Sequence, residues 1–192
     1  AKDDLSIQVH PDDAYAKAHE NGSLGKTECW FILDCKENAT LVVGHNAKTK
    51  EELEQMIHEG RWKEFIREIP IKPGDFIQID PGTVHAIKGG TLLLETQQSS
   101  DITYRMYDYD RLSNGKPRQL HIAQSIDVIT VPAKSADNSV VHTEKKDDAI
   151  QQLIQCPYYT VYRIDVEHRV ETWQDKPFAL MSRMIAAMAD AR

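Results

Sequence analysis

The chain has 192 residues, enough for one domain with a sizeable core, or for one domain and part of another. Its formal net charge of -7 at pH 7 argues against general binding to nucleic acid or to anionic membranes. The sequence has no apolar run of membrane-spanning length, no signal-peptide core and no CxxC pair among its three cysteines. We therefore expect a cytoplasmic protein with reduced thiols.

The first predicted strand runs from Leu5 to His10, where apolar and polar residues alternate. Gln8 and His10 share one face of this strand, with Cα atoms roughly 7 Å apart, and are therefore able to converge on one ion. Taken alone, the same pattern is more typical of a half-buried edge strand with a polar outer face. Pro11 ends the strand, and residues 12–19 predict a short helix with acidic residues in its first turn.

The second predicted strand, from Glu28 to Leu33, is apolar on both faces except for one carboxylate. Because a buried, uncompensated carboxylate is unfavourable, Glu28 needs a metal cation or a nearby lysine as its partner. Cys29 is able to act as a ligand or nucleophile, but alternation places it on the opposite face from Glu28. We interpret it as a buried structural thiol.

The central part of the chain predicts further short strands and one helical segment. A capping box formed by Thr49 and Glu52, followed by an apolar stripe, predicts a helix over residues 49–66 that Gly60 is able to split. Short strands joined by Pro/Gly turns favour a β-barrel or a β-sandwich. These strands are expected at residues 40–44, 69–71, 76–79, 91–97 and 102–107.

The last third of the chain has weaker patterns. Residues 118–128 predict a helix, and residues 131–138 predict a linker. Two strands are expected at residues 158–166 and 167–173, and residues 181–192 form a short helix-forming stretch.

Motifs spread over residues 5–111 resemble those of a known enzyme family. The spacing of Gly74, the Pro81-Gly82 turn and His85 is similar to the second signature of the cupin superfamily, with Asp80 where that pattern usually has proline. More specifically, the chain resembles the short bacterial form of the zinc-dependent type I mannose-6-phosphate isomerases. The four motifs are Gln8-x-His10-Pro11-Asp12, Gly25-Lys26-x-Glu28, Pro81-Gly82-x-x-His85-Ala86 and Ser100-Asp101-x-x-x-Arg105.

This resemblance implies a mainly β fold, a cupin (jelly-roll β-barrel) with a helical insertion and part of a second cupin-like half. The implied division is a metal-binding cupin domain at 1–132, followed by a linker and a partial second domain at 133–192. It also implies a Zn²⁺ site with imidazole and carboxylate ligands. The implied ligands are His10, Glu28, His85 and Gln8. Taken one at a time, the two histidines are better explained as satisfied core residues and Glu28 as an ion-pair partner.

The implied reaction interconverts D-mannose 6-phosphate and D-fructose 6-phosphate through an enediolate. The resemblance assigns catalytic positions to Arg105, Lys26 and Asp101, and substrate contacts to Lys26 and Ser6. Because arginine stays protonated, we expect Arg105 to stabilise the enediolate and Asp101 to orient its guanidinium. Lys26 and Ser6 are almost as well explained by a solvated loop and ordinary strand polarity.

Two other functions are compatible with the same residues. A cupin module could hold a metal and a sugar without catalysis, and two histidines with one carboxylate also suit the Fe(II) of an oxygenase. Lys26 and Arg105 favour a phosphorylated sugar over an O₂ reaction. The start and end of the chain depart from the family pattern, as expected for a fragment or a processed product. We therefore expect metal binding with weak or no isomerase turnover.

Overall fold

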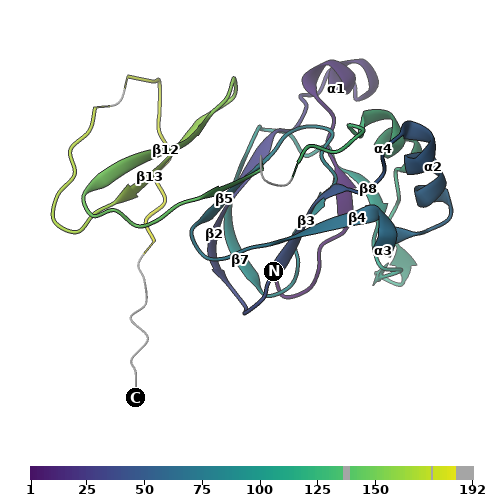
Figure 1. Cartoon of the computed structure of the whole chain (residues 1–192). Helices are drawn as coiled ribbons and strands as arrows, with labels where there is room; N and C mark the ends of the chain where they lie inside the picture. Colours follow the sequence, from purple (N-terminus) through teal and green to yellow (C-terminus); the bar gives the residue numbers. More distant parts are fainter. Residues whose placement is uncertain (136–138, 174, 185–192) are drawn as a thin grey trace.

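The structure is a computed structural model that describes residues 1–135, 139–173 and 175–184. Two antiparallel sheets form its centre (Figure 1). The five-stranded sheet has the order β4 (Ile66–Pro70), β3 (Thr40–His45), β6 (His85–Ala86), β1 (Ile7–Val9) and β8 (Tyr104–Tyr107). The four-stranded sheet has the order β11 (Val140–His142), β5 (Asp75–Ile79), β2 (Glu28–Cys35) and β7 (Thr91–Gln97).

The remaining elements lie outside these two sheets. The helices are α1 (Asp13–His19), α2 (Lys50–His58), α3 (Trp62–Phe65) and α4 (Ile122–Val128). Two small antiparallel pairs complete the described fold: β9 (Leu112–Ser113) with β10 (Lys116–Pro117), and β12 (Ala149–Gln155) with β13 (Thr160–Asp165). In Figure 1, α2, α3 and α4 lie beside the five-stranded sheet, and the β12–β13 pair lies beyond β5 on the opposite side.

Alternation along β3 separates two apolar cores. Leu41 and Val43 pack with Trp30 and Ile77 of the other sheet. Val42 points the opposite way and packs with residues from α2, α3 and α4. The five-stranded sheet is therefore buried on both faces, because it lies between the four-stranded sheet and the helices.

The predicted helix over residues 49–66 is divided into α2 and α3. Thr49 caps α2 by accepting a hydrogen bond from the backbone N–H of Glu52 at 3.2 Å, as the capping pattern predicted. Gly60, with φ +66, breaks the helix, which confirms the expected split. The predicted end at residue 66 is wrong, since Ile66 already begins β4 and pairs with His45.

The predicted helix over residues 118–128 begins four residues too early. The helix in the structure is α4, from Ile122 to Val128. The backbone N–H of His121 donates to the carbonyl of Arg105 at 2.7 Å, and the Arg118 side chain binds Asp108. These contacts with β8 and the residues that follow it replace the first helical turn.

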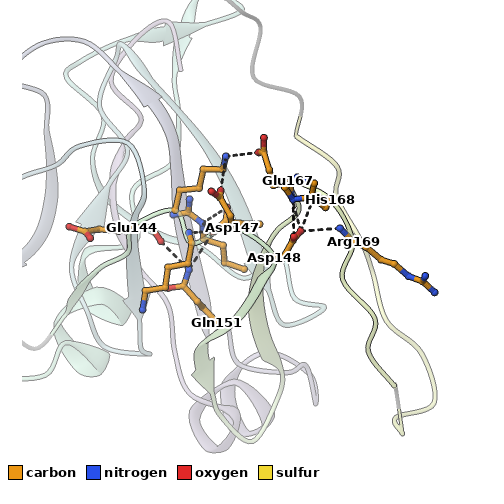
Figure 2. Close-up of polar contacts among 11 residues, drawn as sticks. Glu144, Asp147, Asp148, Gln151, Glu167, His168 and Arg169 are labelled. Atoms are coloured by element: carbon orange, nitrogen blue, oxygen red, sulfur yellow. Dashed lines mark hydrogen bonds and ion pairs between the residues drawn. The ribbon is translucent and has the colours of Figure 1, made fainter.

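The C-terminal strands also differ from the prediction. β13 confirms a strand within 158–166, whereas β12 was not predicted. The strand expected at residues 167–173 is wrong, because those residues have no strand structure. Instead, the Asp148 carboxylate accepts hydrogen bonds from the backbone N–H groups of Glu167, His168 and Arg169 at 3.0, 2.9 and 3.1 Å (Figure 2). A side chain thus satisfies the donors that a strand would have paired.

Two further expectations concern the chain beyond residue 132. β11 pairs with β5, so the four-stranded sheet includes residues from both sides of the expected boundary at 132. That boundary and the second cupin-like half stay predictions. Residues 181–184 have no regular structure, and the rest of the helix-forming stretch lies outside the described residues. Within the described ranges, no helix has the length and apolar character needed to cross a membrane.

Candidate metal centre

Neighbouring strands bring three ligand-type side chains together between the two sheets. Glu28 begins β2, His85 begins β6, and His10 follows β1. β6 is central in its sheet, and His85 is in register with Gln8 on one side and Val43 on the other. This pairing places Gln8 beside His85, a neighbour that the alternation along the first strand did not predict.

The three side chains are buried and close together. Their candidate ligand atoms all lie within 4.8 Å of one another, and each side chain is 1% exposed. Glu28 Oε2 is 3.4 Å from His10 Nε2, and Glu28 Oε1 is 3.4 Å from His85 Nε2. The two imidazole ring centroids are 4.8 Å apart. One carboxylate therefore faces two imidazoles from a single side.

Backbone carbonyls fix the orientation of both imidazoles. His10 Nδ1 is 2.8 Å from the carbonyl oxygen of Ile102, and His85 Nδ1 is 2.8 Å from that of Thr83. Because a carbonyl oxygen only accepts, each Nδ1 carries the proton. In a neutral ring the lone pair then lies on Nε2, facing Glu28, which is the arrangement typical of metal-binding histidines.

The cluster fits a divalent cation because three of its inward-facing atoms lack hydrogen-bond partners. His10 Nε2 and both carboxylate oxygens of Glu28 are buried without such a partner. Burial alone would raise the pKa of Glu28, but the close approach of His10 and the charges of His85 and Lys26 lower it to about 2. Burial lowers the pKa of His85 to about 4. An ionised carboxylate and a neutral imidazole are the protonation states that a metal site needs.

Gln8 lies against the same cluster. Its side-chain nitrogen is 3.2 Å from His85 Nε2, and the Ser6 hydroxyl is 3.4 Å from its side-chain oxygen. An amide carries both donor and acceptor atoms, so Gln8 is able to offer an oxygen at this position.

Lys26 reaches the cluster from the loop before β2. Its Nζ is 3.2 Å from Glu28 Oε2, and the residue is 8% exposed. The structure therefore does not support the solvated-loop interpretation of Lys26. A buried ammonium beside the carboxylate gives Glu28 the positive partner that the sequence required.

Arg105 lies beside Gln8, since these two residues pair between β1 and β8. Its Nε donates to the Ser6 hydroxyl at 3.3 Å, and its NH1 donates to the Gln119 carbonyl at 3.0 Å. Asp101 is exposed and is not among the described hydrogen-bond or ion-pair partners of Arg105. The expected orienting contact from Asp101 is therefore wrong for this structure; Ser6 and Gln119 hold the guanidinium instead.

Glu95 is a carboxylate near the cluster that the sequence reasoning missed. It is exposed at the edge of the site, on β7, and faces Trp30 across the β2–β7 pairing. Trp30 Nε1 donates to Glu95 Oε2 at 3.2 Å, and the Trp30 ring packs against His85. Desolvation, followed by the charge of Glu28, raises the pKa of Glu95. Alternation along β2 was the sequence signal for this neighbourhood, because it places Trp30, the partner of Glu95, on the same face as Glu28.

A second missed feature is the buried Asp108, which gathers two arginines near Arg105. Asp108 Oδ1 is 2.6 Å from Arg111 NH2, and its Oδ2 accepts from Arg118 Nε at 2.7 Å. Hydrogen bonding to Arg118 is the main cause that lowers the pKa of Asp108 to about 2. The site thus has three neighbouring guanidinium groups and one carboxylate among them.

We expect Asp108→Asn to lower the free energy of unfolding at pH 7 by about 1–3 kcal/mol, because the arginines lose a buried anionic partner. The folded-state pKa of Asp108, about 2, lies below its ordinary value of 3.8. Its contribution is therefore complete above about pH 5 and is lost as the pH falls towards 2. Urea unfolding of both proteins across this range measures the difference, which should shrink with falling pH. A difference independent of pH would contradict this assignment.

Cys29 occupies the predicted position away from the cluster. It is buried, and burial raises the pKa of its thiol to about 11. Such a thiol is not a nucleophile at neutral pH, which agrees with a structural role.

Comparison with known proteins identifies the family. No protein-family model matches the chain. Mannose-6-phosphate isomerase ManA of Bacillus subtilis is 51% identical over 183 residues, which are 95% of this chain and 58% of the relative. The mannose-6-phosphate isomerase of Streptococcus mutans is 48% identical over 183 residues, 95% of this chain and 57% of the relative. The chain belongs to the mannose-6-phosphate isomerase family. It spans about half the length of the curated relatives it matches.

A solved mannose-6-phosphate isomerase confirms the fold. The crystal structure of the enzyme from Bacillus subtilis superposes with a TM-score of 0.77 at 48% identity, covering 87% of this chain and 54% of that one. The family resemblance and the mainly β cupin fold predicted from the sequence are therefore confirmed.

Proposed function

We propose that the buried cluster is the active site of an isomerase that interconverts D-mannose 6-phosphate and D-fructose 6-phosphate. One observation carries the proposal: His10, Glu28 and His85 form a buried group with unpartnered ligand atoms, and Lys26 lies against it. The names of the relatives support the same reaction, since both are mannose-6-phosphate isomerases. The substrate is accordingly a small sugar phosphate.

We propose zinc as the metal, held by His10, Glu28 and His85, with Gln8 as a further ligand. Two neutral imidazoles and a carboxylate are typical of catalytic zinc sites, and these three ligands leave a position that Gln8 or a substrate oxygen would take. When bound, the ion supplies Lewis acidity and positive charge at the centre of the cluster.

Two cations of the chain suit the charge that develops during isomerisation. An enediolate carries negative charge on the oxygens of C1 and C2, so a preorganised positive group nearby lowers the barrier. Arg105 supplies a permanent charge next to Gln8. Lys26 supplies three donors beside Glu28, and Ser6, which accepts from Arg105, is suited to a substrate oxygen. The proposed role of Asp101 rests on the family resemblance alone.

The reaction also needs a group that takes a proton from one carbon and returns it to the other. We propose Glu95 for this transfer. Its carboxylate borders the cluster, and the hydrogen bond from Trp30 fixes its orientation. Its raised pKa agrees with a carboxylate able to hold a proton.

The test is an isomerase assay on this chain, purified from a host that lacks its own mannose-6-phosphate isomerase. Metal content is measured by elemental analysis, and fructose 6-phosphate formation is followed with coupling enzymes. We expect one zinc per chain, and turnover that a chelator removes and added zinc restores. The His85→Ala variant, prepared in parallel, gives the background.

If the metal-loaded chain showed no turnover above that of His85→Ala, the proposal would be overturned. A non-catalytic module that binds metal and sugar would then be favoured. Bound iron, with consumption of O₂, would favour an oxygenase. The cytoplasmic location and the expected lack of nucleic-acid and membrane partners stay predictions.

A further inference from the structure

The loop that carries Lys26 has all of its backbone donors engaged. The N–H of Gly25 donates to Asp13 Oδ1 at 2.8 Å, and the N–H of Lys26 donates to the Pro11 carbonyl at 3.0 Å. The N–H of Thr27 donates to Gln98 Oε1 at 2.8 Å. Two of these three acceptors are side chains from other parts of the chain. Backbone pairing within a sheet therefore does not account for these two hydrogen bonds.

The two side-chain acceptors are also bonded to each other. Gln98 Nε2 donates to Asp13 Oδ1 at 3.1 Å, and the Gln98 backbone N–H donates to the Thr27 carbonyl at 2.9 Å. Gln98 is buried, whereas Asp13 lies in the first turn of α1. We call Asp13 and Gln98 the loop clamp, because they hold the backbone on both sides of Lys26.

Close packing at Gly25 holds the loop against α1. A Cβ atom on Gly25 would lie 2.3 Å from the carbonyl carbon of Asp12 and 2.5 Å from the backbone nitrogen of Asp13. The absence of a side chain therefore allows the approach that puts the Gly25 N–H within reach of Asp13. The second oxygen of Asp13 accepts from the Tyr158 hydroxyl at 2.9 Å, which fixes the carboxylate from the other side.

We propose that Asp13 and Gln98 are positioning residues that fix the Gly25–Thr27 backbone and so hold the Lys26 ammonium at the metal cluster. Neither residue touches the cluster, so both act through Lys26. Lysine has a long, flexible side chain. The position of its ammonium group therefore depends on how firmly its backbone is held. The catalytic part of this inference rests on the proposed function, whereas the structural part does not.

The physical reason is the accuracy that catalysis demands of Lys26. Its Nζ lies 3.2 Å from Glu28 Oε2, within a buried site. Misplacement of a catalytic group by about 1 Å is able to cost about 10²-fold in rate. His10, Glu28 and His85, in contrast, are held by strands and by carbonyls outside the clamp. Loosening the clamp should therefore affect Lys26 more than metal binding.

The structural test measures the loop directly in Asp13→Ala and Gln98→Ala. We expect amide hydrogen exchange at Gly25 to rise about tenfold in Asp13→Ala, and that at Thr27 to rise about tenfold in Gln98→Ala. Acylation of Lys26 by an amine-reactive reagent, read by peptide mass spectrometry, should become faster in both variants. Zinc content should stay at the wild-type value.

Two matched variants separate positioning from general destabilisation. Asp13→Asn keeps an oxygen acceptor in the same shape and should restore slow exchange and slow acylation. Asp34→Ala removes an exposed carboxylate near the far end of β2 that accepts from the Cys35 N–H and does not bond to the loop. This control should leave the exchange rates at Gly25 and Thr27 unchanged.

The functional test combines Asp13→Ala with Lys26→Ala. Asp13→Ala alone should lower kcat by about 10-fold to 10²-fold. In the Lys26→Ala background the same change should have no further effect, because a residue that acts through Lys26 cannot matter without it.

Exchange and acylation rates unchanged in Asp13→Ala and Gln98→Ala would overturn the inference, as would equal kcat losses with and without Lys26. If the wild-type chain shows no turnover, the proposed function fails, while the exchange and acylation rates still decide whether the clamp holds Lys26.

Discussion

The His85→Ala variant should lose its bound metal on dialysis, while the wild-type chain retains one ion. His85 faces Glu28 with Nε2 and is fixed through Nδ1 by the Thr83 carbonyl, so no neighbouring histidine can take its place. Loss of an outer hydrogen-bond partner of a ligand already costs about 10–100-fold in affinity, and loss of the ligand itself should exceed that. Elemental analysis and competition with a chromophoric chelator measure the change.

The matched control is His58→Ala, which removes an exposed histidine at the end of α2, away from the cluster. It should retain metal at the wild-type level. Isomerase turnover should fall in His85→Ala to the level of the assay without enzyme and remain unchanged in the control. Equal metal affinity in both variants would exclude His85 as a ligand.

The family resemblance supplied the proposed ligand set, and local patterns in the sequence agree with it. Alternation paired Gln8 with His10, and the buried carboxylate of Glu28 required a cation. The Pro81-Gly82 turn before His85 matched a known signature. What the sequence did not contain was the register that places Gln8 opposite His85, because strand pairing depends on the whole sheet.

The missed residues depend on contacts between distant segments. Asp108 and Arg118 are ten residues apart with a small strand pair between them, so neither alternation nor helical spacing connects them. Asp101 illustrates the opposite error. Its separation of four residues from Arg105 suggested a contact, but four-residue spacing brings side chains together on a helix. Arg105 is on a strand, and Asp101 lies before that strand begins.

The surroundings of Arg105 do not favour its charge. Burial, followed by repulsion from Arg118, lowers the pKa of Arg105, although Asp108 partly offsets this. A cation whose charge is disfavoured in the folded state adds little to stability. Its place beside Gln8 agrees with the proposed role of its charge toward a substrate.

Arg105→Ala should lower kcat by about 10²–10³-fold, the usual cost of removing one electrostatic stabiliser of a developing oxyanion. Metal content should not change, since the guanidinium bonds to Ser6 and Gln119 and to none of the three proposed metal ligands His10, Glu28 and His85. The free energy of unfolding should not fall either, because one of three crowded positive charges is removed. Steady-state kinetics, elemental analysis and urea unfolding on the same preparation measure these three quantities.

Two further variants distinguish a specific role from a general charge effect. Arg105→Lys keeps the charge but loses the planar group that reaches Ser6 and Gln119 together, so it should recover only part of the lost kcat. Arg61→Ala removes an arginine that pairs with Glu59 and Glu64 on the surface, and it should leave kcat unchanged. If Arg105→Ala and Arg61→Ala had the same kcat, Arg105 would have no part in the reaction, and Lys26 would remain as the charged donor beside Glu28.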